Sequence, residues 1–219
     1  MRFFRIRAVI LAALASTVAR PTVSAQAAER PMTAADLPSR LAPTTRQAIV
    51  HLGDSLRAAG LPDAPLYAKA AEGVLKGAAD ARILVVLRTL ARELGDARAS
   101  LGSGADEAEL VAGASALHVG ASPAMLRQLH DTHAGASRAA TSLATPLVAF
   151  ADLLARRVPA AVAAAAIDSL VARGAPGDDF AALRAGVGRD IDAGRAPEAS
   201  VVQRMQGLLR NIEGRRRTP

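Results

Sequence analysis

Apolar and polar positions follow one another along most of this chain with the period of an α-helix. Two stripes show the three- and four-residue spacing most clearly: Ile83, Leu87, Leu90 and Leu94, and Val201, Met205, Leu208 and Ile212. Such spacing gathers apolar side chains on one face of a helix, which then packs on its neighbours. Strict alternation is rare and runs of β-branched residues are short, so strands are not indicated. The pattern predicts an all-α fold.

The helical segments are separated by short breaks, in which a glycine or similar residue precedes small residues or proline. The breaks fall at Gly60, Gly77, Gly102 or Gly104, Gly120, Gly135, Arg157, Gly174 and Gly194. Glycine just past a helix end adopts the left-handed conformation at little cost, and proline favours the start of the next helix. The expected helices are 44–59, 64–76, 80–99, 105–118, 122–133, 137–156, 159–173, 178–193 and 197–213. We therefore expect eight or nine short helices, in an irregular helical-hairpin array or a compact bundle.

Several helix starts carry residues that suit capping. Three starts have such side chains: Thr44 with Gln47, Asp106 with Glu109, and Ser122 before Pro123. A side-chain oxygen at these positions accepts a backbone N–H that the first turn leaves without an intrahelical partner. Pro146 is expected to kink or split the sixth helix, since proline inside a helix removes one hydrogen bond.

The first 25 residues have the three parts of a secretory signal peptide. A basic segment, 1–7, precedes a 12-residue apolar run, 8–19, and small residues end the segment at Ala25. The apolar run is shorter than the roughly 20 residues that cross a bilayer. The alternative is a short buried N-terminal helix. We expect an exported protein, periplasmic or secreted, cleaved after Ala25, with Ala27 and Ala28 as alternative cleavage positions.

The rest of the chain divides by its pattern into three parts. Residues 26–40 lack periodicity and contain two prolines, so they are expected to be a flexible leader. Residues 41–213 should form a single all-helical domain. Residues 214–219 form a short basic tail, which we interpret as solvated, because three arginines bind an anionic surface only weakly; contact with such a surface is the alternative.

Composition narrows the possible functions. The chain has 27 basic and 20 acidic residues, and the first 25 residues hold four arginines and no acid, so the remainder carries only +3. This is weak evidence for nucleic-acid binding, which requires a basic stripe on one face. The absence of cysteine excludes disulfides and thiolate metal sites. The most apolar later segment, 146–170, is interrupted by charges, so no transmembrane segment is expected in the mature chain.

The second helix holds the most informative residues. Lysine occurs only at positions 69 and 76, and at 100° per residue Lys69, Glu72 and Lys76 share one face. Gly73 lies beside them, although glycine inside a helix costs about 1 kcal/mol relative to alanine. The residues expected to face the core are Tyr67, Ala71, Val74 and Leu75. We interpret Lys69, Glu72, Gly73 and Lys76 as a contact surface or small anionic site; the alternative is a solvated stripe in which Gly73 allows a neighbouring helix to approach.

Catalytic and metal motifs are weak by comparison. His130 and His133 lie one turn apart with His118 nearby, but His133 falls among apolar positions of its helix, where a half-buried histidine near a helix end explains it without metal. Nucleophile-elbow, zinc-protease, phosphate-loop and dinucleotide motifs do not occur in the sequence. Serines such as Ser115, Ser122 and Ser137 suit caps and turns. No catalytic, cofactor-binding or metal-ligating residue is assigned.

These observations favour an exported, non-enzymatic helical protein that acts as an interaction or scaffold module of the cell envelope, with another envelope protein as its partner. Helical-hairpin arrays present extended surfaces that suit protein partners. One alternative is a periplasmic protein that binds a small ligand or metal between its helices. A second is an enzyme whose site carries no recognisable motif.

Overall fold

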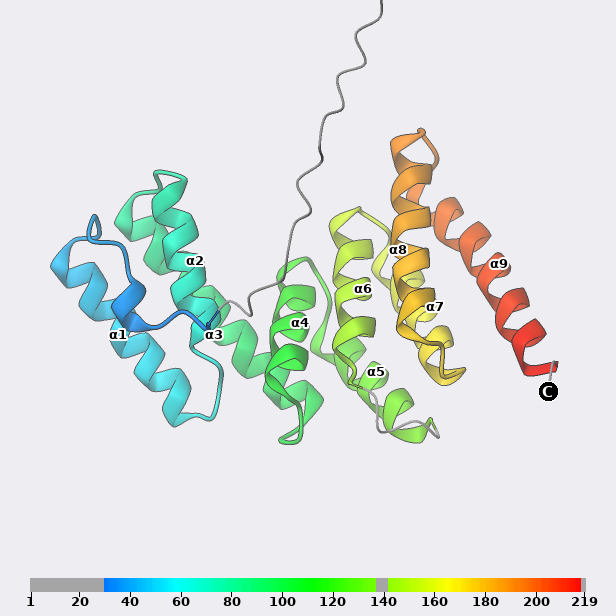
Figure 1. Ribbon diagram of the computed structural model, residues 1–219, viewed down its shortest axis with the longest axis horizontal. Coiled ribbons are helices and arrows are strands. Elements are labelled where there is room, and N and C mark those ends of the chain that lie inside the picture. Colours follow the sequence, from blue (N-terminus) through cyan, green and yellow to red (C-terminus); the bar gives the residue numbers. More distant parts are fainter. Residues whose placement is uncertain (1–29, 137–141, 218–219) are drawn as a thin grey trace, which may run out of the picture. The chain divides into compact units, whose positions relative to one another are not determined.

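The computed structural model describes residues 30–136 and 142–217, and the segment that we expected to be a signal peptide, 1–25, lies outside these ranges (Figure 1). The fold is all-α, as the periodicity predicts, and the regular elements of the described ranges are all helical. The α-helices are α1 (Pro43–Ala58), α2 (Ala64–Leu75), α3 (Asp80–Leu101), α4 (Glu107–His118), α5 (Pro123–Gly135), α6 (Ala144–Ala155), α7 (Ala160–Ala172), α8 (Gly177–Asp192) and α9 (Pro197–Arg217). A short 3₁₀ helix, η1 (Ala34–Asp36), precedes them.

The principal helix contacts join helices that are one or two positions apart along the chain. Helix α3 packs on α1, α2, α4 and α5, α6 packs on α4, α7 and α8, and α9 packs on α7 and α8. Each helix is therefore supported by its near neighbours in sequence, which is the contact pattern of a helical-hairpin array. Among the described helices, none combines the length and apolarity needed to cross a bilayer.

The core consists of two apolar clusters, one centred on α1 to α3 and the other on α5 to α9, with α4 contributing to both. The three described aromatic residues, Tyr67, Phe150 and Phe180, are all buried. Elsewhere in the core, small residues allow neighbouring helices to pack close together. At Gly113 of α4, for example, a Cβ would lie 3.2 Å from the Cβ of Ala97 in α3. Alanine and glycine thus substitute for aromatic bulk by shortening the distance between helices.

Most of the predicted breaks and caps are confirmed. Gly60, Gly77, Gly102, Gly120, Gly174 and Gly194 all have positive φ. Arg157 ends α6 with a φ of 64°, although it carries a side chain. The capping box of Asp106 and Glu109 is present at α4, and the Ser122 hydroxyl accepts from the backbone of Met125 at the start of α5. Gly135 differs, because it is the last residue of α5 and has no positive φ.

Two helix starts differ from the expectation. Helix α1 begins at Pro43, so Thr44 lies inside its first turn and forms no capping box with Gln47. The N–H of the preceding Ala42 donates instead to the Asp80 carboxylate of α3 at 2.9 Å. Helix α6 begins at Ala144, which places Pro146 in its first turn. Proline is tolerated there because the first-turn N–H groups have no intrahelical acceptor, so no kink follows. Residues 137–141, which we expected to belong to this helix, lie outside the described ranges.

Both ends of the described chain pack more closely than expected. Leu37, in the segment expected to be a flexible leader, is 5% exposed and belongs to the first core cluster. Arg40 reinforces this by donating to the carbonyl of Val74 at 3.3 Å. At the other end, α9 continues past residue 213 to Arg217, and Arg215 of the expected tail pairs with Asp179 of α8 at 2.5 Å.

Candidate functional site

The predicted stripe on α2 forms a connected group of charges. Lys69 donates to one carboxylate oxygen of Glu72 at 2.7 Å, and Lys76 donates to the other oxygen. The hydrogen bond from Lys69, followed by that from Lys76, lowers the pKa of Glu72 to about 2. Glu72 therefore stays ionised and holds both ammonium groups on the same exposed face of the helix.

Gly73 lies where α2 meets α3. A Cβ at this position would come within 2.9 Å of Cγ1 of Ile83, so the absence of a side chain allows the two helices to approach. Tyr67 and Val74 are buried as predicted, and Ala71 is half-buried. Leu75 is the exception, with 87% of its surface exposed. It is the last residue of α2 and lies 100° around the helix from Val74, on a side that no neighbouring helix covers.

A shallow hollow of about 170 Å³ separates this stripe from α3. From α2 it is lined by Lys69, Glu72, Gly73 and Lys76, and beyond the turn by Ala78, Arg82, Ile83 and Val86. All four residues singled out on α2 therefore come together, and α3 adds a third cation, Arg82. The hollow has the composition of a small, polar contact area with an apolar floor.

A larger groove of about 550 Å³ lies on the other side of α3, between α3 and α1. Its residues are Leu52, Ser55 and Leu56 of α1, and Val85, Arg88, Thr89, Ala91 and Arg92 of α3. Val85 is 60% exposed, which is unusual for a valine in the middle of a helix. We call the combined area, formed by the hollow and the groove on either side of α3, the α3 surface.

The α3 surface carries unbalanced positive charge. Arg82 and Arg88 are exposed and have no ion pair within residues 30–136 and 142–217, and Arg92 donates only to the Thr89 hydroxyl at 3.2 Å. Nearby Arg57 behaves differently, because it is held by Asp54 and Asp63. Five cations thus share the α3 surface with the single carboxylate of Glu72.

Only the α2 part of this surface was predicted from the sequence. On α3 the prediction covered the inward stripe that begins at Ile83, and not the outer face. The signal that could have identified it is Val85, an apolar residue between Arg82 and Arg88 that lies on the side of the helix away from the inward stripe.

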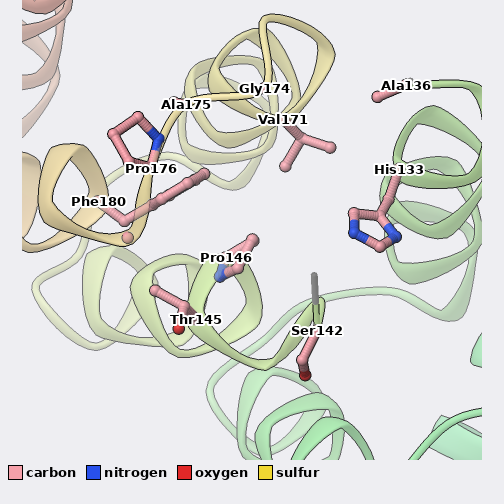
Figure 2. A pocket seen from close by; sticks show the side chains of 11 residues that line it. His133, Ala136, Ser142, Thr145, Pro146, Val171, Gly174, Ala175, Pro176 and Phe180 are labelled. Atoms are coloured by element: carbon pink, nitrogen blue, oxygen red, sulfur yellow. The ribbon is translucent and has the colours of Figure 1, made fainter. Parts of the chain in front are cut away.

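The three histidines considered as metal ligands have separate surroundings. His118 Nδ1 lies 3.0 Å from Glu93, and His130 Nδ1 lies 3.2 Å from the adjacent Asp131. The His133 imidazole points instead into a cavity between α5, α6 and the turn from α7 to α8 (Figure 2). In the described part of the chain, no three metal-ligating side chains come together.

The acidic and hydroxyl groups that could have suggested catalysis take part in structural contacts. Asp190 accepts two hydrogen bonds from Arg204, at 2.8 and 2.6 Å, and these lower the pKa of the carboxyl. Asp179 pairs with Arg215. The Ser115 hydroxyl donates to the carbonyl of Val111 in its own helix, and Ser137 lies outside the described residues.

Comparison of the chain with known protein families, with curated proteins and with solved structures gave no match. The function is therefore inferred from the surfaces and cavities of the protein itself.

Proposed function

We propose that this chain is an exported, non-enzymatic interaction module of the cell envelope, and that its α3 surface binds an acidic, amphipathic helix of a partner protein. The observation that carries the proposal is the exposed Val85 on a groove bordered by Arg88 and Arg92, which have no acidic partner in the described structure. An amphipathic helix laid in such a groove buries its apolar face, and carboxylates along its edges meet the arginines.

Two further features support a protein partner of this kind. The hollow on the other side of α3 extends the positive charge through Arg82 and the two lysines, which adds to the attraction for an acidic partner. The apolar floor of the groove, formed by Leu52, Leu56 and Val85, favours a partner with apolar side chains over a purely ionic polymer.

Photo-crosslinking from the groove tests the proposal. A photoreactive amino acid placed at Val85 in the native host should capture a partner whose crosslinked segment, mapped by mass spectrometry, contains both carboxylates and apolar residues. The matched control is the same amino acid at Val202 of α9, a valine that is 49% exposed outside the α3 surface. Capture of the same segment from both positions, or of no protein from position 85, would contradict the proposal.

Charge reversal on the α3 surface distinguishes specific binding of the partner from nonspecific electrostatic attraction. With the captured segment as a synthetic peptide, Arg88→Glu together with Arg92→Glu should weaken binding at least about tenfold, and added salt should weaken wild-type binding. Arg127→Glu with Arg210→Glu reverses two exposed arginines elsewhere and should leave the affinity unchanged. Equal losses in both double variants would show that only overall charge matters.

The export component has a direct test of its own. The protein recovered from the cell envelope of its native host should begin at Gln26, as determined by N-terminal sequencing. An uncleaved N-terminus on a cytoplasmic protein would refute export, whatever the result for the α3 surface.

A further inference from the structure

A cavity of about 420 Å³ lies away from the α3 surface, where the end of α5, the start of α6 and the turn between α7 and α8 meet (Figure 2). Pro146, Val171 and Phe180 supply apolar walls. Cavities of a few hundred Å³ with apolar walls and a few polar groups are the usual sites for small molecules. The volume is well above the roughly 150 Å³ that accommodates benzene in a dry apolar cavity.

One polar side chain of the cavity lining, that of His133, has a ring nitrogen without a hydrogen-bond partner in the described structure. This nitrogen, Nε2, is buried. Figure 2 shows the imidazole directed into the cavity, opposite Phe180 and Pro146. Buried polar atoms in folded proteins are almost always hydrogen-bonded, so an unpaired ring nitrogen facing a cavity indicates a place for a partner that is not part of the chain.

The Ser142 hydroxyl, which also lines the cavity, is less available than His133. The Ser142 hydroxyl lies within 3.2 Å of the Glu109 carboxylate and 3.4 Å of Asp106, and it accepts the N–H of Ala144. Lysine, arginine, aspartate and glutamate are all missing from the described lining. The described lining thus offers a ligand apolar surface and hydrogen bonds, which suits an uncharged molecule.

We infer that this cavity binds a small, uncharged, mainly apolar molecule with one hydroxyl group, which forms a hydrogen bond with His133 Nε2. The imidazole nitrogen accepts from the hydroxyl or donates to it, according to its tautomer. The apolar part of the ligand contacts Val171 and Phe180. This site shares no residue with the α3 surface and is independent of the proposed function.

Binding of 2-naphthol, compared with naphthalene, tests the inference because the two probes differ only in the hydroxyl group. Fluorescence titration of the full-length protein should show saturable binding of 2-naphthol, and nitrogen NMR should show a shift of the His133 resonance. His133→Leu should weaken 2-naphthol binding at least tenfold and leave naphthalene binding nearly unchanged. His133→Gln, which keeps a hydrogen-bonding group, should restore part of the affinity.

Two controls keep the result interpretable. Ala175→Leu narrows the cavity from the turn before α8 and should weaken both probes, whereas Arg88→Glu with Arg92→Glu should affect neither. Each variant is first checked for wild-type helical content by circular dichroism. Absence of saturable 2-naphthol binding to the wild type, or equal losses of both probes in His133→Leu, would overturn the inference.

Discussion

Gly73 of α2 lies directly against Ile83 of α3, so that a Cβ at Gly73 would be 2.9 Å from Cγ1 and 3.3 Å from Cδ1 of the isoleucine. Ile83 is 3% exposed and fixed in the core, which leaves it little room to move aside. The glycine therefore sets the distance between these helices, and with it the shape of the hollow beside the lysines.

Gly73→Ala should consequently destabilise the protein, even though alanine favours a helix by about 1 kcal/mol. Forcing a methyl group against a buried side chain costs about 1–3 kcal/mol, so we expect a net loss of about 1 kcal/mol in urea denaturation. Gly95→Ala in α3 is the matched control, because nothing lies within 4 Å of its Cβ position, and it should stabilise by about 0.5–1 kcal/mol. Equal stabilisation by both substitutions would show that α2 and α3 do not constrain each other here.

The pKa of Glu72 predicts a specific acid dependence. Its folded-state value of about 2 lies below the ordinary value of 4.5, because Lys69 and Lys76 bind the ionised form. The resulting contribution to stability is complete above pH 4.5 and is lost as the pH falls toward 2. Carbon NMR of the Glu72 carboxyl should show this low titration midpoint, and Glu72→Gln should flatten the dependence of stability on pH in that window.

The lysines can be tested separately in the same measurement. Lys69→Met should raise the pKa of Glu72 more than Lys76→Met, because the hydrogen bond from Lys69 is the larger cause of the shift. The double substitution should return the midpoint close to 4.5. A midpoint that stays near 2 without either lysine would mean that another group holds the carboxylate.

Local patterns predicted much of this fold because their physical causes are local. The breaks at the glycines depend on backbone freedom, and the capping box at Asp106 depends on residues three positions apart, so both are visible in the sequence. The exposure of Leu75 could not be predicted in this way, because whether an apolar residue at a helix surface is covered depends on where the next helix packs. The same limit applies to His133, whose apolar surroundings were predicted but not the cavity.

The ion pair between Arg215 and Asp179 should stabilise the contact between the last turns of α9 and the start of α8. The Asp179 side chain is 8% exposed, whereas that of Arg215 is 53% exposed, so solvent weakens the attraction while the loss of the partner leaves a buried carboxylate. Arg215→Ala should therefore destabilise by about 1 kcal/mol and increase hydrogen exchange in the last turns of α9. Arg210→Ala, which removes an exposed arginine of the same helix, should stay within about 0.5 kcal/mol of wild type.

Glu109 joins the start of α4 to the start of α6. One of its carboxylate oxygens accepts the N–H of Asp106 at 3.1 Å, and the other accepts the N–H of Leu143 at 2.6 Å. Glu109→Ala leaves both donors without these acceptors, and at about 1 kcal/mol for each lost cap the expected destabilisation is about 2 kcal/mol. Glu109→Gln retains an acceptor oxygen and should lose less.

The matched control for Glu109 is Glu107, an exposed residue in the same first turn of α4. Glu107→Ala removes only a favourable interaction with the helix dipole, worth about 0.5 kcal/mol. Chemical denaturation of the three variants therefore separates the charge at the helix end from the connection between helices. If Glu109→Ala costs no more than Glu107→Ala, the contact with Leu143 adds no stability, and other contacts, such as the packing of the buried Pro146 and Leu147, hold the start of α6.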